Sequence, residues 1–103
     1  MAKRKIRWST EAKSDWLSIL GFYNERNGSS AYSFKLNNRI NHSLRLIAKY
    51  PNIGLATDYD SVRCLITSDY QIIYEVFDQL ILVIMVWDSK RNPEDKKIGK
   101  RIK

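Results

Sequence analysis

Three cationic residues lie in or just after expected strands, and their side chains are the best candidates for binding phosphate. Arg63 stands in an alternating apolar stretch, and Lys90 and Arg91 directly follow a long apolar run. A rigid strand end can hold such groups in place, and guanidinium and ammonium groups stabilise charge that develops on phosphorus. The pattern therefore predicts a phosphate clamp, or a catalytic set for RNA cleavage. The alternative is that all three are ordinary surface cations.

Other residue types with chemical potential have plainer interpretations. Tyr70, Tyr74 and Trp87 could stack on bases, although a place in the core is the favoured interpretation. Cys64 is expected to be a buried thiol. His42 falls mid-helix among polar residues and is expected on the surface, with a role as general base as the alternative. Two loop acids are expected to be solvated rather than to bind a cation: Asp58 and Asp60.

The first half of the chain has the pattern of one strand and two helices. Residues 5–8 alternate polar and apolar, which is typical of a short strand. Ser9 or Thr10 is expected to cap a helix that ends at Asn27-Gly28, and Ser29 or Ser30 to cap a second that stops at Tyr50-Pro51. The short link between the two helices predicts an antiparallel hairpin. Each helix has an apolar stripe: Ala12, Trp16, Leu17, Leu20 and Tyr23 in the first, and Tyr32, Leu36, Ile40, Leu44 and Ile47 in the second.

The second half has the pattern of three strands joined by tight links. Residues 61–67 alternate, residues 70–77 follow after a turn, and residues 80–87 are apolar on both faces. The last run is expected to be the most buried, central strand. The fold predicted is α+β in the order β-α-α-β-β-β, a helical hairpin packed on a small, mostly antiparallel four-stranded sheet.

The positive charge gathers at the two ends of the chain. The sequence holds 18 Lys and Arg against 11 Asp and Glu, a net charge of +7, and residues 8–89 together are slightly acidic. Cationic ends suit a nucleic acid or an acidic protein, or they are solvated tails. The basic C-terminal segment 90–103 supplies the predicted nucleic-acid-binding residues: Lys96, Lys97, Lys100 and Arg101.

Length and composition exclude several classes of protein. A chain of 103 residues fits one domain, expected over residues 1–103. The longest apolar run is too short to cross a bilayer, and no secretory signal follows the first residues, so we expect a cytoplasmic protein without a membrane partner. One cysteine cannot form an internal disulfide, one histidine cannot build a zinc site by itself, and the scattered glycines form no phosphate-binding loop. We therefore expect no metal and no cofactor.

Four short motifs in order resemble the RelE/ParE superfamily, the toxins of bacterial type II toxin–antitoxin modules. They are Tyr50-Pro-Asn-Ile-Gly54, Val62-Arg63, Tyr70-Gln-Ile-Ile-Tyr-Glu-Val76 and Val86-Trp-Asp-Ser-Lys-Arg-Asn-Pro93. The resemblance covers the whole chain, including the order of its elements. It implies a toxin that a cognate antitoxin neutralises, and a complex that reaches its operator DNA only through the antitoxin.

The superfamily has two activities, and the resemblance leaves both open for this chain. RelE-like members cleave mRNA on the ribosome, whereas ParE-like members are linked to inhibition of DNA gyrase. The RelE-like pattern has cations on the second and third strands, where this chain has Val62, Cys64 and Gln71, and only Arg91 matches clearly. Cleavage by Arg63, Lys90 and Arg91 with another base, His42 or Asp88, is a further alternative. Outside the family, the alternatives are a non-toxic basic module that binds nucleic acid and a subunit that docks an acidic partner.

Overall fold

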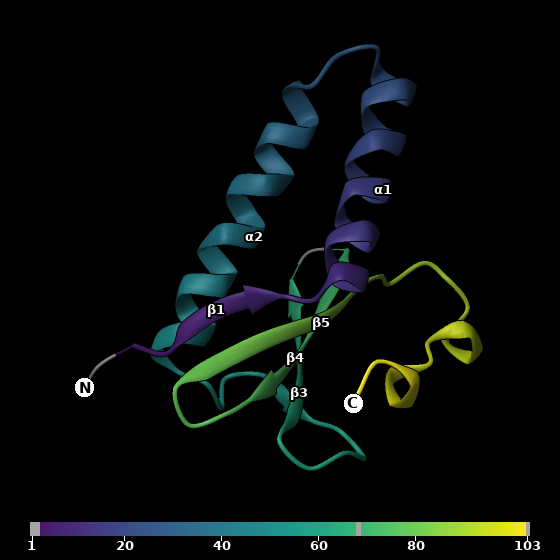
Figure 1. The fold of residues 1–103 in the computed structure, drawn as a ribbon. Coiled ribbons are helices and arrows are strands. Elements are labelled where there is room, and N and C mark those ends of the chain that lie inside the picture. The colour runs from purple at the N-terminus through teal and green to yellow at the C-terminus, as the bar shows by residue number, and fades with distance from the viewer. Residues whose placement is uncertain (1–2, 68, 103) are drawn as a thin grey trace.

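Two helices cover one face of a five-stranded sheet in the computed structural model, which describes residues 3–67 and 69–102 (Figure 1). The elements are β1 (Lys5–Trp8), α1 (Thr10–Asn27), α2 (Ala31–Lys49), β2 (Leu55–Ala56), β3 (Val62–Thr67), β4 (Tyr70–Val76) and β5 (Leu80–Asp88). Two short 3-10 turns follow, at Pro93–Asp95 and Ile98–Lys100. The predicted α+β class and helical hairpin are confirmed.

The sheet differs from the predicted one in two respects. Its order is β1-β5-β4-β3-β2, so it has five strands rather than four. The extra strand, β2, is two residues long and pairs with β3 through Leu55–Cys64 and Ala56–Arg63. A strand that short has no periodicity to detect. Because β2 adds a strand at one edge, the middle strand is β4 rather than β5, the strand predicted to be central. β5 is still an interior strand, between β1 and β4, and most of its residues are buried.

Strand pairing is antiparallel except at the first strand. β1 lies parallel to β5, with Lys5 opposite Leu80 and Trp8 opposite Val83. The pairing of β4 with β5 shifts register between Ile73 and Tyr74, so Ile84 has no opposite residue. The extra residue makes a β-bulge in β5, directly after Val83, the last residue of β5 that pairs with β1.

Local signals explain where the helices begin and end. The Ser9 hydroxyl accepts a hydrogen bond from the Ala12 amide at 3.0 Å, and Gly28 ends α1 in the left-handed conformation with φ 65°. The expected cap of α2 is only partly right. Ser30 occupies the cap position but its side chain makes no cap hydrogen bond, and the Ser29 hydroxyl instead accepts from the Ala31 amide at 3.5 Å.

Each face of the sheet has a buried core, and a different part of the chain packs on each one. The helix-facing core joins Trp16, Leu36 and Ile40 of the helices to Tyr70, Ile72 and Tyr74 of β4. The opposite core holds six buried residues: Val62, Cys64, Ile73, Ile84, Met85 and Trp87. Ile98 and Ile102 pack against it from the C-terminal segment, which Figure 1 shows away from the helices in yellow.

Candidate functional site

Arg63 is a half-buried residue whose side chain binds backbone oxygens. Its Nη1 donates to the Gly54 carbonyl at 2.7 Å and, at the longer distance of 3.4 Å, to the Asn52 carbonyl. The guanidinium thus holds the loop that leaves α2. Part of the Arg63 guanidinium, which was predicted to bind phosphate, is therefore already bonded to the backbone.

Lys90 and Arg91 lie at the other end of the sheet. Both are exposed after the end of β5, and the Arg91 guanidinium stacks over the Trp87 ring at 4.3 Å from its centre. Arg63 pairs with Tyr74, whereas Asp88 pairs with Tyr70. Those two rows are four residue steps apart on β4, or about 13 Å along the strand. The structure therefore does not bring Arg63 together with Lys90 and Arg91 in one clamp.

The C-terminal strap, residues 93–102, is the element that carries the four basic residues of the predicted nucleic-acid site. It crosses the sheet face that the helices leave free, with Ile98 and Ile102 turned to the core. Lys97 and Lys100 are exposed, and Lys96 is half-buried. The Lys96 ammonium donates to Gln71 Oε1 at 2.7 Å, which ties the strap to β4.

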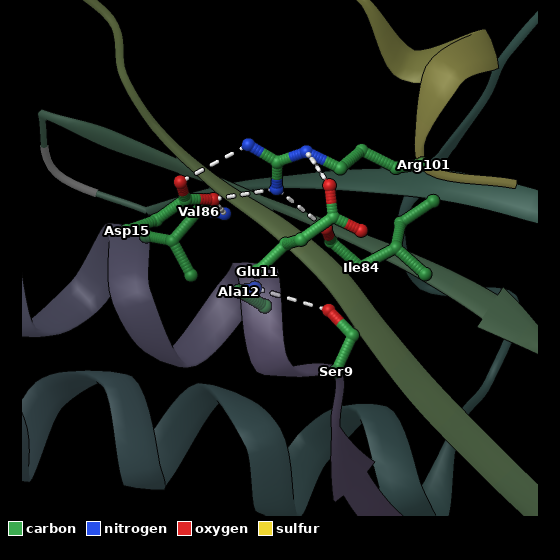
Figure 2. A network of polar contacts seen from close by, with 7 residues as sticks. All are labelled: Ser9, Glu11, Ala12, Asp15, Ile84, Val86 and Arg101. Carbon is green, nitrogen blue, oxygen red and sulfur yellow. Dashed lines mark hydrogen bonds and ion pairs between the residues drawn. The ribbon is translucent and has the colours of Figure 1, made fainter.

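Arg101 is the strap residue with the most contacts (Figure 2). Its Nη1 and Nη2 donate to the two carboxylate oxygens of Asp15 at 2.9 and 3.1 Å, and its Nε lies 3.3 Å from Glu11. Nη1 also donates to the Ile84 carbonyl at 2.9 Å. The hydrogen bonds that Arg101 donates to Asp15 raise the pKa of Arg101, although burial opposes the shift. Most of the Arg101 N–H donors are already bonded, so this side chain fixes the strap to α1 and β5 and has few donors left for a nucleic acid.

Asp15 and Arg101 meet beside the part of β5 that extends past β1. Asp15 Oδ2 also accepts a hydrogen bond from the Val86 amide at 3.1 Å, and Arg101 donates one to the Ile84 carbonyl. These two backbone groups lie beyond the end of β1, where no strand can pair with them. Glu11 and Asp15 are four residues apart on α1, so they face the same side of the helix (Figure 2).

A second network holds the Tyr50–Gly54 motif. The Gly54 amide donates to the Tyr74 hydroxyl at 3.0 Å, and that hydroxyl donates to the Pro51 carbonyl at 2.7 Å. A Cβ atom on Gly54 would lie 2.7 Å from the same hydroxyl oxygen. The motif residues that resemble the toxin superfamily therefore support the fold at this point.

The remaining candidate side chains have structural places. Tyr70, Tyr74 and Trp87 are buried, so their rings are not free to stack on bases in this structure. Burial raises the pKa of the Cys64 thiol, despite Lys96 nearby, and such a thiol is a weak nucleophile. His42 is exposed on α2. Within residues 3–67 and 69–102 no group of three or more potential ligands is placed to hold a metal ion.

Sequence reasoning missed Asp15 and the Tyr74 hydroxyl as organising groups. Asp15 had a weak signal, because it lies one turn after Glu11 beside the apolar stripe of α1. Its partner Arg101 is 86 residues away, and nothing local indicates the pairing. Tyr74 stood out by its aromatic type and by its place in the Tyr70–Val76 motif, but neither feature indicates a role for its hydroxyl.

Comparison with known proteins identifies the class to which this arrangement belongs. Residues 6–93 match the family model described as "ParE toxin of type II toxin-antitoxin system, parDE". The chain belongs to this ParE toxin family, and thus to the RelE/ParE superfamily.

A solved structure supports the fold independently. A chain described as "Chromosomal ParDE TA system from P. aeruginosa" aligns with a TM-score of 0.69 and 16% sequence identity, covering 85% of this chain and 98% of its own length. No curated protein sequence matches significantly. In the described part of the chain, no helix combines the length and apolar character that crossing a membrane requires.

Proposed function

We propose that this protein inhibits growth by acting on DNA gyrase in the cytoplasm and that a cognate antitoxin neutralises it. The ParE family match over residues 6–93 is the observation that carries the proposal. The side chains on the strands support it. At the positions where RelE-like nucleases have cations, Val62 and Cys64 are buried under the strap and Gln71 is neutral. The alternative catalytic set was Arg63, Lys90 and Arg91, but Arg63 lies at the opposite end of the sheet from the other two.

The first test is growth on expression of the protein alone and with the product of its neighbouring gene. Arrest that the neighbour relieves is the expected result. Harmless expression of a folded, soluble protein would contradict the toxin assignment and favour a non-toxic nucleic-acid-binding module.

The second test separates the two targets. Purified protein is added to a gyrase supercoiling reaction and, in parallel, to a translation reaction whose mRNA is mapped by primer extension. We expect loss of supercoiling with intact mRNA. Codon-spaced cuts that appear only on translating ribosomes would overturn the gyrase proposal, and Arg63, Lys90 and Arg91 would then be replaced one at a time.

The helical hairpin offers the surface that we propose the antitoxin covers. Two large apolar side chains are exposed on it, Leu17 of α1 at 68% and Phe34 of α2 at 67%. Phe22, 56% exposed, lies on another side of α1, near Val86 and Arg91. Exposed apolar patches of this kind mark protein interfaces. Operator DNA is reached, in this proposal, only through the antitoxin.

The hairpin surface can be tested with matched variants. Leu17→Glu and Phe34→Glu should abolish co-purification with the antitoxin while the toxin still folds, because neither side chain is in the core. Phe77→Glu, at the 43% exposed residue in the β4–β5 link, is the control and should leave the complex intact. Complex formation by both hairpin variants would exclude this surface.

A further inference from the structure

A cavity of about 700 Å³ lies between the strap and the β2–β3 edge of the sheet. Its apolar lining includes Leu55 and Ala56 of β2, Cys64 and Ile66 of β3, and Ile98 of the strap, and Tyr59 lines it from the loop between the two strands. Leu55, Tyr59 and Ile66 are 63%, 44% and 55% exposed, so this apolar surface is open to a ligand. We call this space the strap cavity. Its volume falls in the range of sites that hold small molecules, which is roughly 300–1,000 Å³.

Three lysines from five consecutive strap positions line the same cavity: Lys96, Lys97 and Lys100. The acid among its lining residues is Asp58. In residues 3–67 and 69–102, no ion pair involves any of these lysines. Lys96 bonds to the neutral amide of Gln71. Like charges gathered beside an apolar surface focus a positive potential on the space between them, which favours an anionic ligand.

Contact between the strap and the β2–β3 loop defines one side of the cavity. A Cβ atom on Gly99 would lie 2.6 Å from the Tyr59 hydroxyl oxygen and 3.2 Å from its Cζ. The strap backbone therefore passes directly against this ring, and glycine is the residue that permits it. The Tyr59 ring therefore lies against the strap segment that carries the lysines.

We propose that the strap cavity binds a nucleotide, either free or as one unit of a single strand. The phosphate would interact with Lys97 and Lys100, and the base would pack against Leu55, Ile66 and the Tyr59 ring. Aromatic and apolar surfaces beside cations are the combination that binds bases without sequence preference. A bare inorganic anion would use only the lysines. The proposal goes beyond the growth-inhibiting activity and does not depend on the cellular target.

The test measures binding to the full-length protein at low ionic strength, using ATP, a short oligouridylate, inorganic phosphate and polyglutamate as probes. Two variants address the two halves of the site. Lys97→Ala/Lys100→Ala removes cations whose side chains make no hydrogen bond within the described residues. Ile66→Glu places a carboxylate on the apolar surface. Lys5→Ala/Lys35→Ala and Phe77→Glu are the controls, since they make the same charge changes at exposed positions outside the cavity.

We expect ATP, the oligouridylate or both to bind saturably, and each site variant to weaken binding by about tenfold, as loss of a charge-assisted contact does. The control variants should change affinity less than about twofold. The tighter of the two nucleotide probes identifies the source of the ligand. Thermal unfolding of every variant shows that it folds.

Three results would overturn the proposal. One is the absence of saturable binding of either nucleotide probe. Another is an equal loss of binding in the site and control variants, which would indicate attraction to net charge alone. The third is binding of polyglutamate or phosphate as tightly as the nucleotides with no effect of Ile66→Glu, which would assign the cavity to an acidic peptide or to a simple anion.

Discussion

At the scale of single residues, two buried tyrosines of β4 differ in what their hydroxyls contact. The Tyr74 hydroxyl makes two hydrogen bonds, with Gly54 and Pro51. The buried Tyr70 hydroxyl has no hydrogen bond of good geometry among the described residues, and the nearby polar side chain is Tyr23. Tyr74→Phe should lower the free energy of unfolding by about 1–3 kcal/mol because it leaves buried backbone groups unpaired. Tyr70→Phe should leave stability unchanged or raise it. Urea denaturation of the two variants measures the difference, and equal losses would refute the assignment.

The same tyrosines predict a pH dependence of stability. Burial raises the pKa of both Tyr70 and Tyr74 above the usual value of 10.0. A group whose pKa is raised on folding contributes its full stabilisation below the unfolded pKa, and this is lost as the pH rises through the folded one. Stability should therefore fall as the pH rises above 10.0. The slope of the unfolding free energy against pH should be smaller in Tyr70→Phe, and an unchanged slope would contradict this origin.

Gly54 is constrained by its surroundings rather than by its own backbone angles. The Cβ of Gly54→Ala would meet the Tyr74 hydroxyl at 2.7 Å and the Cys64 backbone at 3.1 Å. We expect a loss of about 1–3 kcal/mol from overpacking. Thermal or urea unfolding measures it. The Gly54→Ala/Tyr74→Phe double variant should lose less than the sum of the two single losses, because removal of the hydroxyl relieves one of the clashes. Additive losses would show that the clash is not with the hydroxyl.

At the scale of elements, the strap is held to α1 by one arginine. Arg101→Ala should cost about 1–3 kcal/mol, because it leaves the Ile84 carbonyl and a partly buried Asp15 without their partner. Glu11→Gln is the matched control. Glu11 is 50% exposed in its ion pair, so its loss should cost less than about 1 kcal/mol. Urea denaturation compares the two, and hydrogen exchange should show faster opening of the strap in Arg101→Ala only.

At the scale of the whole molecule, the strap completes the core on the side that the helices leave open. The ParE family match ends at residue 93, so most of the strap lies outside it. A chain ending at Asn92 should keep the helix-facing core but expose the apolar face around Ile84, Met85 and Trp87. We expect it to bind a hydrophobic dye and to self-associate. Light scattering and dye fluorescence measure this, and a monomer that binds no dye would show that the strap does not protect this face.

The sequence by itself determined the class of fold, the helical hairpin and the family. These depend on short-range patterns: an apolar residue every three or four positions in the helices, alternation in β3, and the Ser9 and Gly28 caps. Each signal acts within a few residues, so it can be detected in one chain.

Tertiary structure decided how the predicted site residues are used. The candidate cations Arg63, Lys90 and Arg91 proved to lie at two ends of the sheet, because their placement depends on strand register rather than on spacing. Arg101 fixes the strap through Asp15, a partner 86 residues away in the sequence. The two-residue β2 is a strand through its pairing with β3. Long-range pairing depends on which surfaces meet after the chain has folded, and local propensity carries no information about that.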